Sequence, residues 1–148
     1  MKIPENKTLQ ELFEWRFSRT PDSVAHKFLD RETTYKELNN YSNQVANGLI
    51  ELGCKPDTRI AYYGKNSDFF FEVLIGTLKS NTVTVGVNWR LAPPEVSYVL
   101  NDSESEVLFV GADFYPVIDK ILEDLPKIKK VVAIDGAVSY THLTLPTT

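Results

Sequence analysis

The stretch RIAYYGKNSDFFFEVLIGTLKSNTVTVGV, residues 59–87, decides the fold of this chain of 148 residues. It begins with a β-rich run at residues 59–63, continues with a helical pattern at residues 68–79 and returns to a β-rich run at residues 82–87. A strand, a helix and a second strand in this order form a βαβ unit, in which the two strands are parallel. The stretch therefore predicts the start of a parallel sheet.

The same alternation continues after this stretch. We expect a short helix at residues 93–100, a buried strand at 107–110, a helix at 113–125 and a strand at 130–134. Successive βαβ units build a mostly parallel sheet with helices on both faces. The predicted fold class is therefore α/β.

The residues before this stretch predict two helices and a hairpin. Residues 8–11 (TLQE) fit a capping box that opens a helix, and Pro21 makes the preceding residue a boundary. Residues 24–35 are expected to form a β-hairpin. The strongest helical periodicity then spans residues 38–52, and Gly53 follows it where a left-handed residue commonly ends a helix.

Charge and composition exclude several classes of function. Sixteen Lys and Arg against twenty Asp and Glu give a formal net charge of −4, and only Lys127, Lys129 and Lys130 cluster, on an expected solvated edge. No apolar run approaches the roughly 20 residues of a membrane span, and the first residues lack the pattern of a secretory signal. We expect one domain, no nucleic acid partner, no transmembrane segment and a cytoplasmic location.

Few residues have the pattern of a catalytic or metal site. Cys54 has no His or Asp arranged to activate it, and we expect an unreactive free thiol. His26 stands alone on an expected strand, where a surface or hydrogen-bonded core imidazole is expected rather than a general base. The sequence contains neither G-x-G-x-x-G nor Gly-Lys-Ser/Thr, the usual phosphate loops. We assign no catalytic residue and no metal ligand.

The composition changes abruptly near the C-terminus. Residues 138–148, VSYTHLTLPTT, contain no charged side chain and include His142. They back-translate to GTCTCTTATACACATCTGACGCTGCCGACGA, which is similar to a transposase adapter of shotgun sequencing libraries. Our hypothesis is that residues 1–137 are native and residues 138–148 are translated adapter, to be left out of fold reasoning. The alternative is a flexible polar C-terminus.

A series of short motifs occurs in order along residues 8–136. The motifs are LQELF (9–13), TPD (20–22), TYKEL (34–38), SNQVANGL (42–49), KNS (65–67), GTLK (76–79), VNWRL (87–91), PEV (94–96) and NDS (101–103). In this order and spacing they resemble the opening of AMP-forming acyl-CoA synthetases, particularly the medium- and long-chain fatty-acid ligases. Each motif alone is weak, but the series in register is specific for the adenylate-forming superfamily.

Two positions depart from the family pattern. Asn81 stands where relatives usually have glycine, and we expect it to adopt the left-handed conformation that asparagine tolerates. Gly86 stands where relatives usually have proline, so the fixed backbone angle is lost near the end of a strand. In relatives this strand leads toward the substrate-binding region. The acyl-chain preference therefore stays open.

The resemblance implies that the chain is an incomplete N-terminal part of the adenylate-forming enzyme fold. The parent protein would then be an acid–thiol ligase that uses ATP and Mg²⁺ to join a small carboxylic acid, in the first place a fatty acid, to AMP, and passes the acyl group to CoA. The phosphate loop and the catalytic lysine of the family have no match in this chain. The fragment by itself is therefore expected to be inactive.

One residue is a candidate for cofactor binding. Arg90 matches an arginine that lies near the nucleotide phosphate of CoA in some ligases of this family, and a guanidinium suits phosphate geometry. The alternative is an ordinary surface arginine. Its neighbour Trp89 is expected to pack against the protein rather than stack on a ligand.

Two other readings stay open at this stage. A self-contained α/β module that binds a ligand or a protein, such as a flavodoxin-type or receiver domain, would need a phosphate-holding loop or an acidic cluster after a strand, and neither is found. Luciferases and the adenylation domains of peptide synthetases share the adenylation step and differ in the acceptor. The block at residues 88–91 favours a CoA ligase.

Overall fold

The computed structural model describes residue 5 and residues 7–134. The helices and strands are α1 (Leu9–Arg19), β1 (Val24–Phe28), β2 (Arg31–Thr34), α2 (Tyr35–Glu51), β3 (Arg59–Tyr63), α3 (Asp68–Lys79), β4 (Val83–Val87), α4 (Pro93–Asp102), β5 (Val107–Gly111), α5 (Tyr115–Ile121) and β6 (Lys130–Ile134). Short 3₁₀ turns, η1 (Ala112–Phe114) and η2 (Leu122–Asp124), flank α5.

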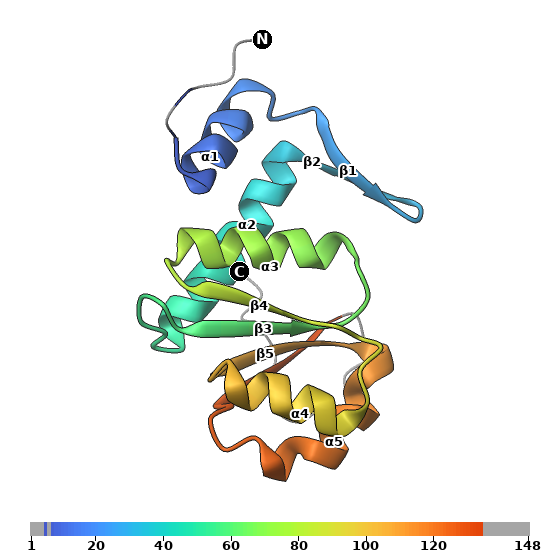
Figure 1. Cartoon of the computed structure of the whole chain (residues 1–148). Helices are drawn as coiled ribbons and strands as arrows, with labels where there is room; N and C mark the ends of the chain where they lie inside the picture. The colour runs from blue at the N-terminus through green and yellow to red at the C-terminus, as the bar shows by residue number, and fades with distance from the viewer. Residues whose placement is uncertain (1–4, 6, 135–148) are drawn as a thin grey trace.

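The main sheet has four parallel strands in the order β4-β3-β5-β6. Helices α2 and α3 cover one face, and α4 and α5 cover the other (Figure 1). The chain runs from β3 outward to β4 and then crosses to β5 on the other side of β3. The predicted α/β class with helices on both faces is confirmed.

The alternation of side chains along β3 explains why both faces are covered. Ile60 and Tyr62 belong to the apolar cluster under α2 and α3, whereas Ala61 and Tyr63 belong to the cluster under α4 and α5. All four side chains are buried. A strand without a solvent face is typical of a parallel sheet.

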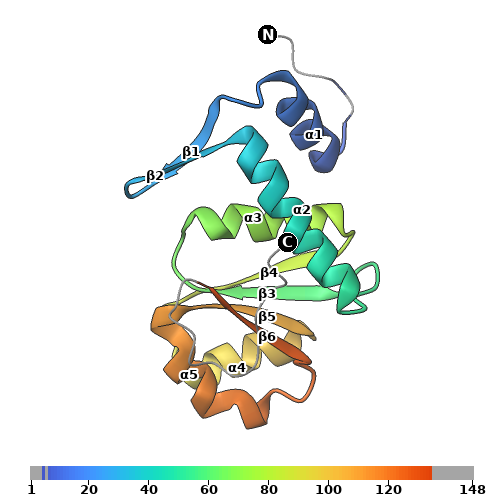
Figure 2. The same ribbon diagram turned by 180° about the vertical axis from the view of Figure 1, so that it is seen from behind.

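The predicted hairpin forms a separate two-stranded antiparallel sheet next to α2 and α3, away from the main sheet (Figures 1 and 2). Thr34 ends β2 and caps α2, because its hydroxyl accepts from the Glu37 N–H while the Glu37 carboxylate accepts from the Thr34 N–H. The same capping box, between Thr8 and Glu11, opens α1 as predicted.

Two turn residues have the predicted backbone conformation. Gly53 follows α2 with φ 79°, and Asn81 follows α3 with φ 56°. Asparagine tolerates this left-handed region better than most residues, so the departure from glycine at position 81 keeps the turn into β4.

The segment predicted to be helical at residues 113–125 is helical over residues 112–124, but it does not form one continuous α-helix. The segment is broken into η1, α5 and η2. Pro116 has no N–H to donate to a preceding carbonyl, which restricts it to the first turn of a helix, so α5 begins only at Tyr115. At the other end, the Asn101 side chain donates to the carbonyl oxygen of Asp124 over 2.9 Å and holds the second turn.

The crossing of α2 and α3 generates a test of the packing. A Cβ atom on Gly76 would lie 2.5 Å from Cγ1 of Val45, so we expect Gly76→Ala to lower the free energy of unfolding by about 1–3 kcal/mol. Without that contact, alanine would stabilise the helix by about 1 kcal/mol. Gly86→Ala is the control, because nothing lies within 4 Å of its added Cβ. Urea denaturation of both variants measures the difference, and a stabilised Gly76→Ala would contradict the packing.

Candidate functional site

The strand order reverses between β3 and β5, and three loops meet at the carboxyl edge of the sheet there. In open parallel sheets, ligands bind outside the carboxyl ends of the strands at such a reversal. Gly64 begins the loop after β3, and Gly111 is the last residue of β5. The two lie in close contact, since a Cβ on Gly64 would lie 3.5 Å from the Gly111 nitrogen. This edge is therefore the candidate site.

A lysine from the first loop joins an aspartate from the last. Nζ of Lys65, after β3, lies 2.8 Å from Oδ2 of Asp113, after β5. Both side chains are more than half exposed, at 58% and 66%. Nζ of Lys65 also lies 5.7 Å from the ring centre of Trp89, which follows β4. All three loops thus contribute to one cluster.

Arg90 completes the cluster from the same loop as Trp89. Its guanidinium carbon lies 4.5 Å from the centre of the Trp89 ring, and its backbone N–H donates to Oδ1 of Asn88 over 3.0 Å. Its side chain is exposed, and no ion pair joins it to another described residue. Trp89 is half-buried and packs on Phe114, as predicted, with ring centres 6.3 Å apart. Two cationic side chains therefore lie near one indole.

The backbone that carries Lys65 is held by Tyr62. Its hydroxyl donates to the Lys65 carbonyl oxygen over 3.2 Å and lies 3.1 Å from Oγ of Ser67. Ser67 precedes α3 but makes no side-chain capping bond, because its hydroxyl faces Tyr62 instead. The loop after β3 is therefore tied to the strand that precedes it.

This arrangement can bind an anion but offers no acid–base chemistry. Lys65 and Arg90 supply positive charge, and Trp89 supplies a flat apolar face beside them, which suits a phosphate attached to a ring system. No group of three His, Cys, Asp or Glu among the described residues could hold a metal ion.

The structure places the other residues considered from sequence outside this edge. Cys54 is half-buried after α2, where burial and then the charge of Glu106 raise the pKa of its thiol, as expected for an unreactive cysteine. His26 stacks on Phe71 with ring centres 5.5 Å apart. Its side chain is half-buried and its Nε2 is buried without a hydrogen-bond partner, so the hydrogen-bonded core imidazole, one of the two expected alternatives to a general base, is not what the structure shows. Residues 138–148, with His142, lie outside the described residues.

The basic cluster near the last strand is a solvated edge, as predicted. Lys127 pairs with Glu104, and Lys129 pairs with Glu106. Their charges are thereby balanced by neighbouring carboxylates. In the part of the chain that the structure describes, none of the helices combines the length and apolarity that a membrane span needs.

A family model described as AMP-binding enzyme matches residues 13–147. The chain belongs to this family. The fatty acid–[acyl-carrier-protein] ligase ScoC of Streptomyces coeruleorubidus is 40% identical over 118 residues, which are 80% of this chain and 23% of that protein. Bacitracin synthase 2 of Bacillus licheniformis is 38% identical over 78% of this chain and 4% of that protein.

The solved structures agree with the family. The anthranilate CoA ligase AuaEII, in complex with anthranoyl-AMP, matches with a TM-score of 0.83 and 30% identity over 90% of this chain and 27% of that one. The chain thus spans about a quarter or less of these relatives and is a partial, N-terminal part of the adenylate-forming fold. Membership in the AMP-binding family decides against a flavodoxin-type or receiver module.

Sequence reasoning singled out Arg90 but missed Lys65 and Asp113. Each of the missed residues stands two positions after the end of a strand, at 63 and 111 respectively. That position was the available signal, because polar residues just after parallel strands gather at one edge.

The ion pair at this edge generates a second prediction. Because Lys65 and Asp113 are both exposed, we expect Asp113→Asn to change the free energy of unfolding by less than about 1 kcal/mol. Asp68→Asn is the contrasting variant, since the buried Asp68 carboxylate accepts two hydrogen bonds from Arg31, and we expect a loss of about 2 kcal/mol. Urea denaturation compares the two, and equal losses would show that the edge pair is structural.

Proposed function

We propose that the parent protein is an ATP-dependent acid–thiol ligase that activates a carboxylic acid, in the first place a fatty acid, as acyl-AMP and transfers the acyl group to CoA. Family membership supports the adenylation step, and ScoC and AuaEII are by name ligases of a fatty acid and of an aromatic acid. The cluster of Lys65, Trp89 and Arg90 is the observation that supports CoA as the acceptor of the acyl group.

In this proposal the residues of this chain contribute to binding, and none of them takes part in making or breaking a bond. ATP with Mg²⁺ supplies the AMP group that turns the carboxylate oxygen into a good leaving group. The described residues contain no metal-binding group, so no residue here is assigned to Mg²⁺ or to catalysis. We propose that the fragment alone is inactive, that the parent is cytoplasmic, and that its partners are the acid, ATP and CoA without nucleic acid.

The edge cluster would hold the nucleotide end of CoA. The Arg90 guanidinium has no ion-pair partner among the described residues and is free to bind phosphate oxygens with two parallel hydrogen bonds. Lys65 adds a second positive charge near the Trp89 ring, and its ion pair with Asp113 holds that lysine there. Trp89 itself is held by Phe114 and stays in place.

This assignment separates CoA from other thiol acceptors. The 3′-phosphate and the adenine belong to CoA, whereas a carrier protein presents a phosphopantetheine arm without them. ScoC, by its name, acts on an acyl carrier protein, and bacitracin synthase 2 is a peptide synthetase. An exposed arginine and lysine at the carboxyl edge support CoA as the acceptor of the parent.

We expect Arg90→Ala in the parent enzyme to raise the KM for CoA about tenfold while ATP–pyrophosphate exchange with the acid is unchanged. Native enzyme should prefer CoA over dephospho-CoA, and the variant should lose that preference, because the missing contact is to the phosphate. Lys55→Ala, an exposed lysine before β3 at the opposite edge, is the matched control.

Two results would contradict the CoA assignment. Equal use of CoA and dephospho-CoA by the native enzyme would show that no residue binds the 3′-phosphate. Acyl transfer to a carrier protein but not to CoA, with exchange intact, would make the parent an acyl-carrier-protein ligase or a peptide-synthetase domain.

We also propose that residues 1–137 are the native part and residues 138–148 translated adapter. Sequencing of the source DNA from upstream of Met1 to beyond codon 137 tests this, and we expect the frame to continue with a sequence other than the adapter. A genomic origin of codons 138–148, followed by a stop codon, would overturn it.

A further inference from the structure

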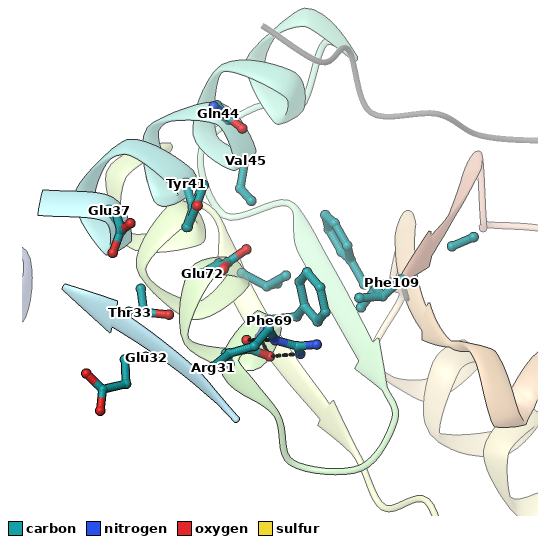
Figure 3. Close-up of a pocket in the computed structure, with 14 residues that line it drawn as sticks. Arg31, Glu32, Thr33, Glu37, Tyr41, Gln44, Val45, Phe69, Glu72 and Phe109 are labelled. Carbon is teal, nitrogen blue, oxygen red and sulfur yellow. Dashed lines mark hydrogen bonds and ion pairs between the residues drawn. The ribbon is translucent and has the colours of Figure 1, made fainter. Parts of the chain in front are cut away.

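A groove of about 620 Å³ lies on the face of the main sheet that α2 and α3 cover, between β2, α2 and α3 (Figure 3). Its apolar lining comes from Phe69 and Val73 of α3, Phe109 of β5 and Ile134 at the end of β6. Tyr41 of α2 lines the wall and is 40% exposed. Val73, Phe109 and Ile134 form a buried apolar floor, and Phe69 and Tyr41 are the large side chains left partly open in a groove that none of the described elements fills.

The polar lining of the groove is mostly acidic. Glu32, Glu37, Asp68 and Glu72 carry carboxylates, and Arg31 is the single basic residue among the described residues of the lining. Three of the carboxylates have partners, because Glu32 pairs with Lys27, Glu37 caps α2 and Asp68 binds Arg31. Burial disfavours the Asp68 carboxylate, but the hydrogen bonds and charge of Arg31 outweigh it and lower its pKa.

Glu72 is the exception. No hydrogen bond or ion pair joins its carboxylate to another described residue, although it is half-buried at the groove. Burial, and then the negative charge of Asp68, raise its pKa from 4.5 to about 7, and the charge of Arg31 only partly opposes them. A buried carboxylate of this kind is stabilised by a cation placed against it.

The hairpin beside the groove is also incomplete as a sheet. A two-stranded sheet is marginally stable by itself in water, and β1 and β2 pair only with each other. The first half of α2 rises from the main sheet toward this hairpin (Figure 2). Its residues Glu37, Tyr41 and Gln44 line the groove. Groove and hairpin therefore lie next to each other, and no element among residues 7–134 covers them.

We propose that this groove is the docking site of a later segment of the parent polypeptide, an apolar segment that brings a lysine or arginine to Glu72. Charge complementarity supports the basic residue, because an acidic lining surrounds an apolar floor. The length of the relatives supports an occupant from the same polypeptide, since this chain spans 23% of ScoC and 27% of AuaEII. The inference rests on family membership and is independent of the thiol acceptor.

The first test compares the direction in which one substitution, Glu72→Gln, changes the Tm of the 148-residue chain and the Tm of the parent enzyme. In the 148-residue chain the raised pKa means that the folded state binds a proton more readily than the unfolded state, so stability is lost as pH rises from 4.5 through about 7. At pH 8 we expect Glu72→Gln to raise the Tm of this chain by about 3 °C. In the parent enzyme the same substitution removes an ion pair, and we expect it to lower the Tm by about 2 °C.

Glu51→Gln is the matched control for this test. Glu51 is an exposed glutamate at the end of α2, outside the groove lining. We expect it to change neither Tm by more than about 1 °C. A Tm raised by Glu72→Gln in both proteins would overturn the proposal, because no basic side chain would then face Glu72.

The second test measures access to the groove. Tyr41→Cys in a Cys54→Ser background places a thiol in the wall, and we expect a disulfide reagent to label it about ten times more slowly in the parent than in the 148-residue chain. Tyr98→Cys on α4 is the control, because Tyr98 is 68% exposed on the opposite face. Mass spectrometry of the labelled peptides gives both rates.

Other occupants give other results. Equal labelling of the wall thiol in both proteins would leave the groove open in the parent and overturn the proposal. Protection in the isolated chain that grows with its concentration would identify a second copy as the occupant, and would also overturn it. Neither test uses CoA or ATP, so failure of the proposed function would leave both results unchanged.

Discussion

The burial of β3 on both faces is the constraint on which the rest of the structure depends. Its residues 60–63 are each at most 4% exposed, and they alternate between two apolar clusters, one on each face of the main sheet. Because neither face is open to water, helices must cover both, and the chain must cross the sheet between strands. The crossing from β4 to β5 brings three loops to one carboxyl edge. The candidate site is a consequence of how the central strand is buried.

Features that depend on local chemistry could be predicted from the sequence. The capping box at Thr8 needs only a hydroxyl and a glutamate three residues later, and it forms as predicted. The same pattern at Thr34 and Glu37 also forms, although it was not predicted. The predicted bounds of β3, α3 and β6 are those of the structure, since each element has a clear periodicity between turn residues. The segment at residues 113–125 shows the limit, because apolar periodicity there continued through Pro116.

The candidate site depends on contacts between residues that are far apart in the sequence, and local sequence patterns do not predict such contacts. Arg90 could be singled out because its neighbours match a family motif. Lys65 and Asp113 are 48 positions apart, and they meet only because β5 lies directly beside β3. The unpaired His26 Nε2 and the raised pKa of Glu72 have the same origin, since burial is set by tertiary packing.

The cluster at the carboxyl edge and the groove are opposite in charge, and each is backed by an apolar cluster on a different face of the main sheet. Trp89 and Phe114 pack on the cluster under α4 and α5, whereas the groove opens on the cluster under α2 and α3. Phe109 and Val110, adjacent on β5, belong one to each cluster, so the surfaces touch through the sheet and share no lining residue. A rigid sheet between sites without common partners makes their free energies nearly additive. Covering the groove should therefore stabilise the domain without altering how the carboxyl edge binds an anion.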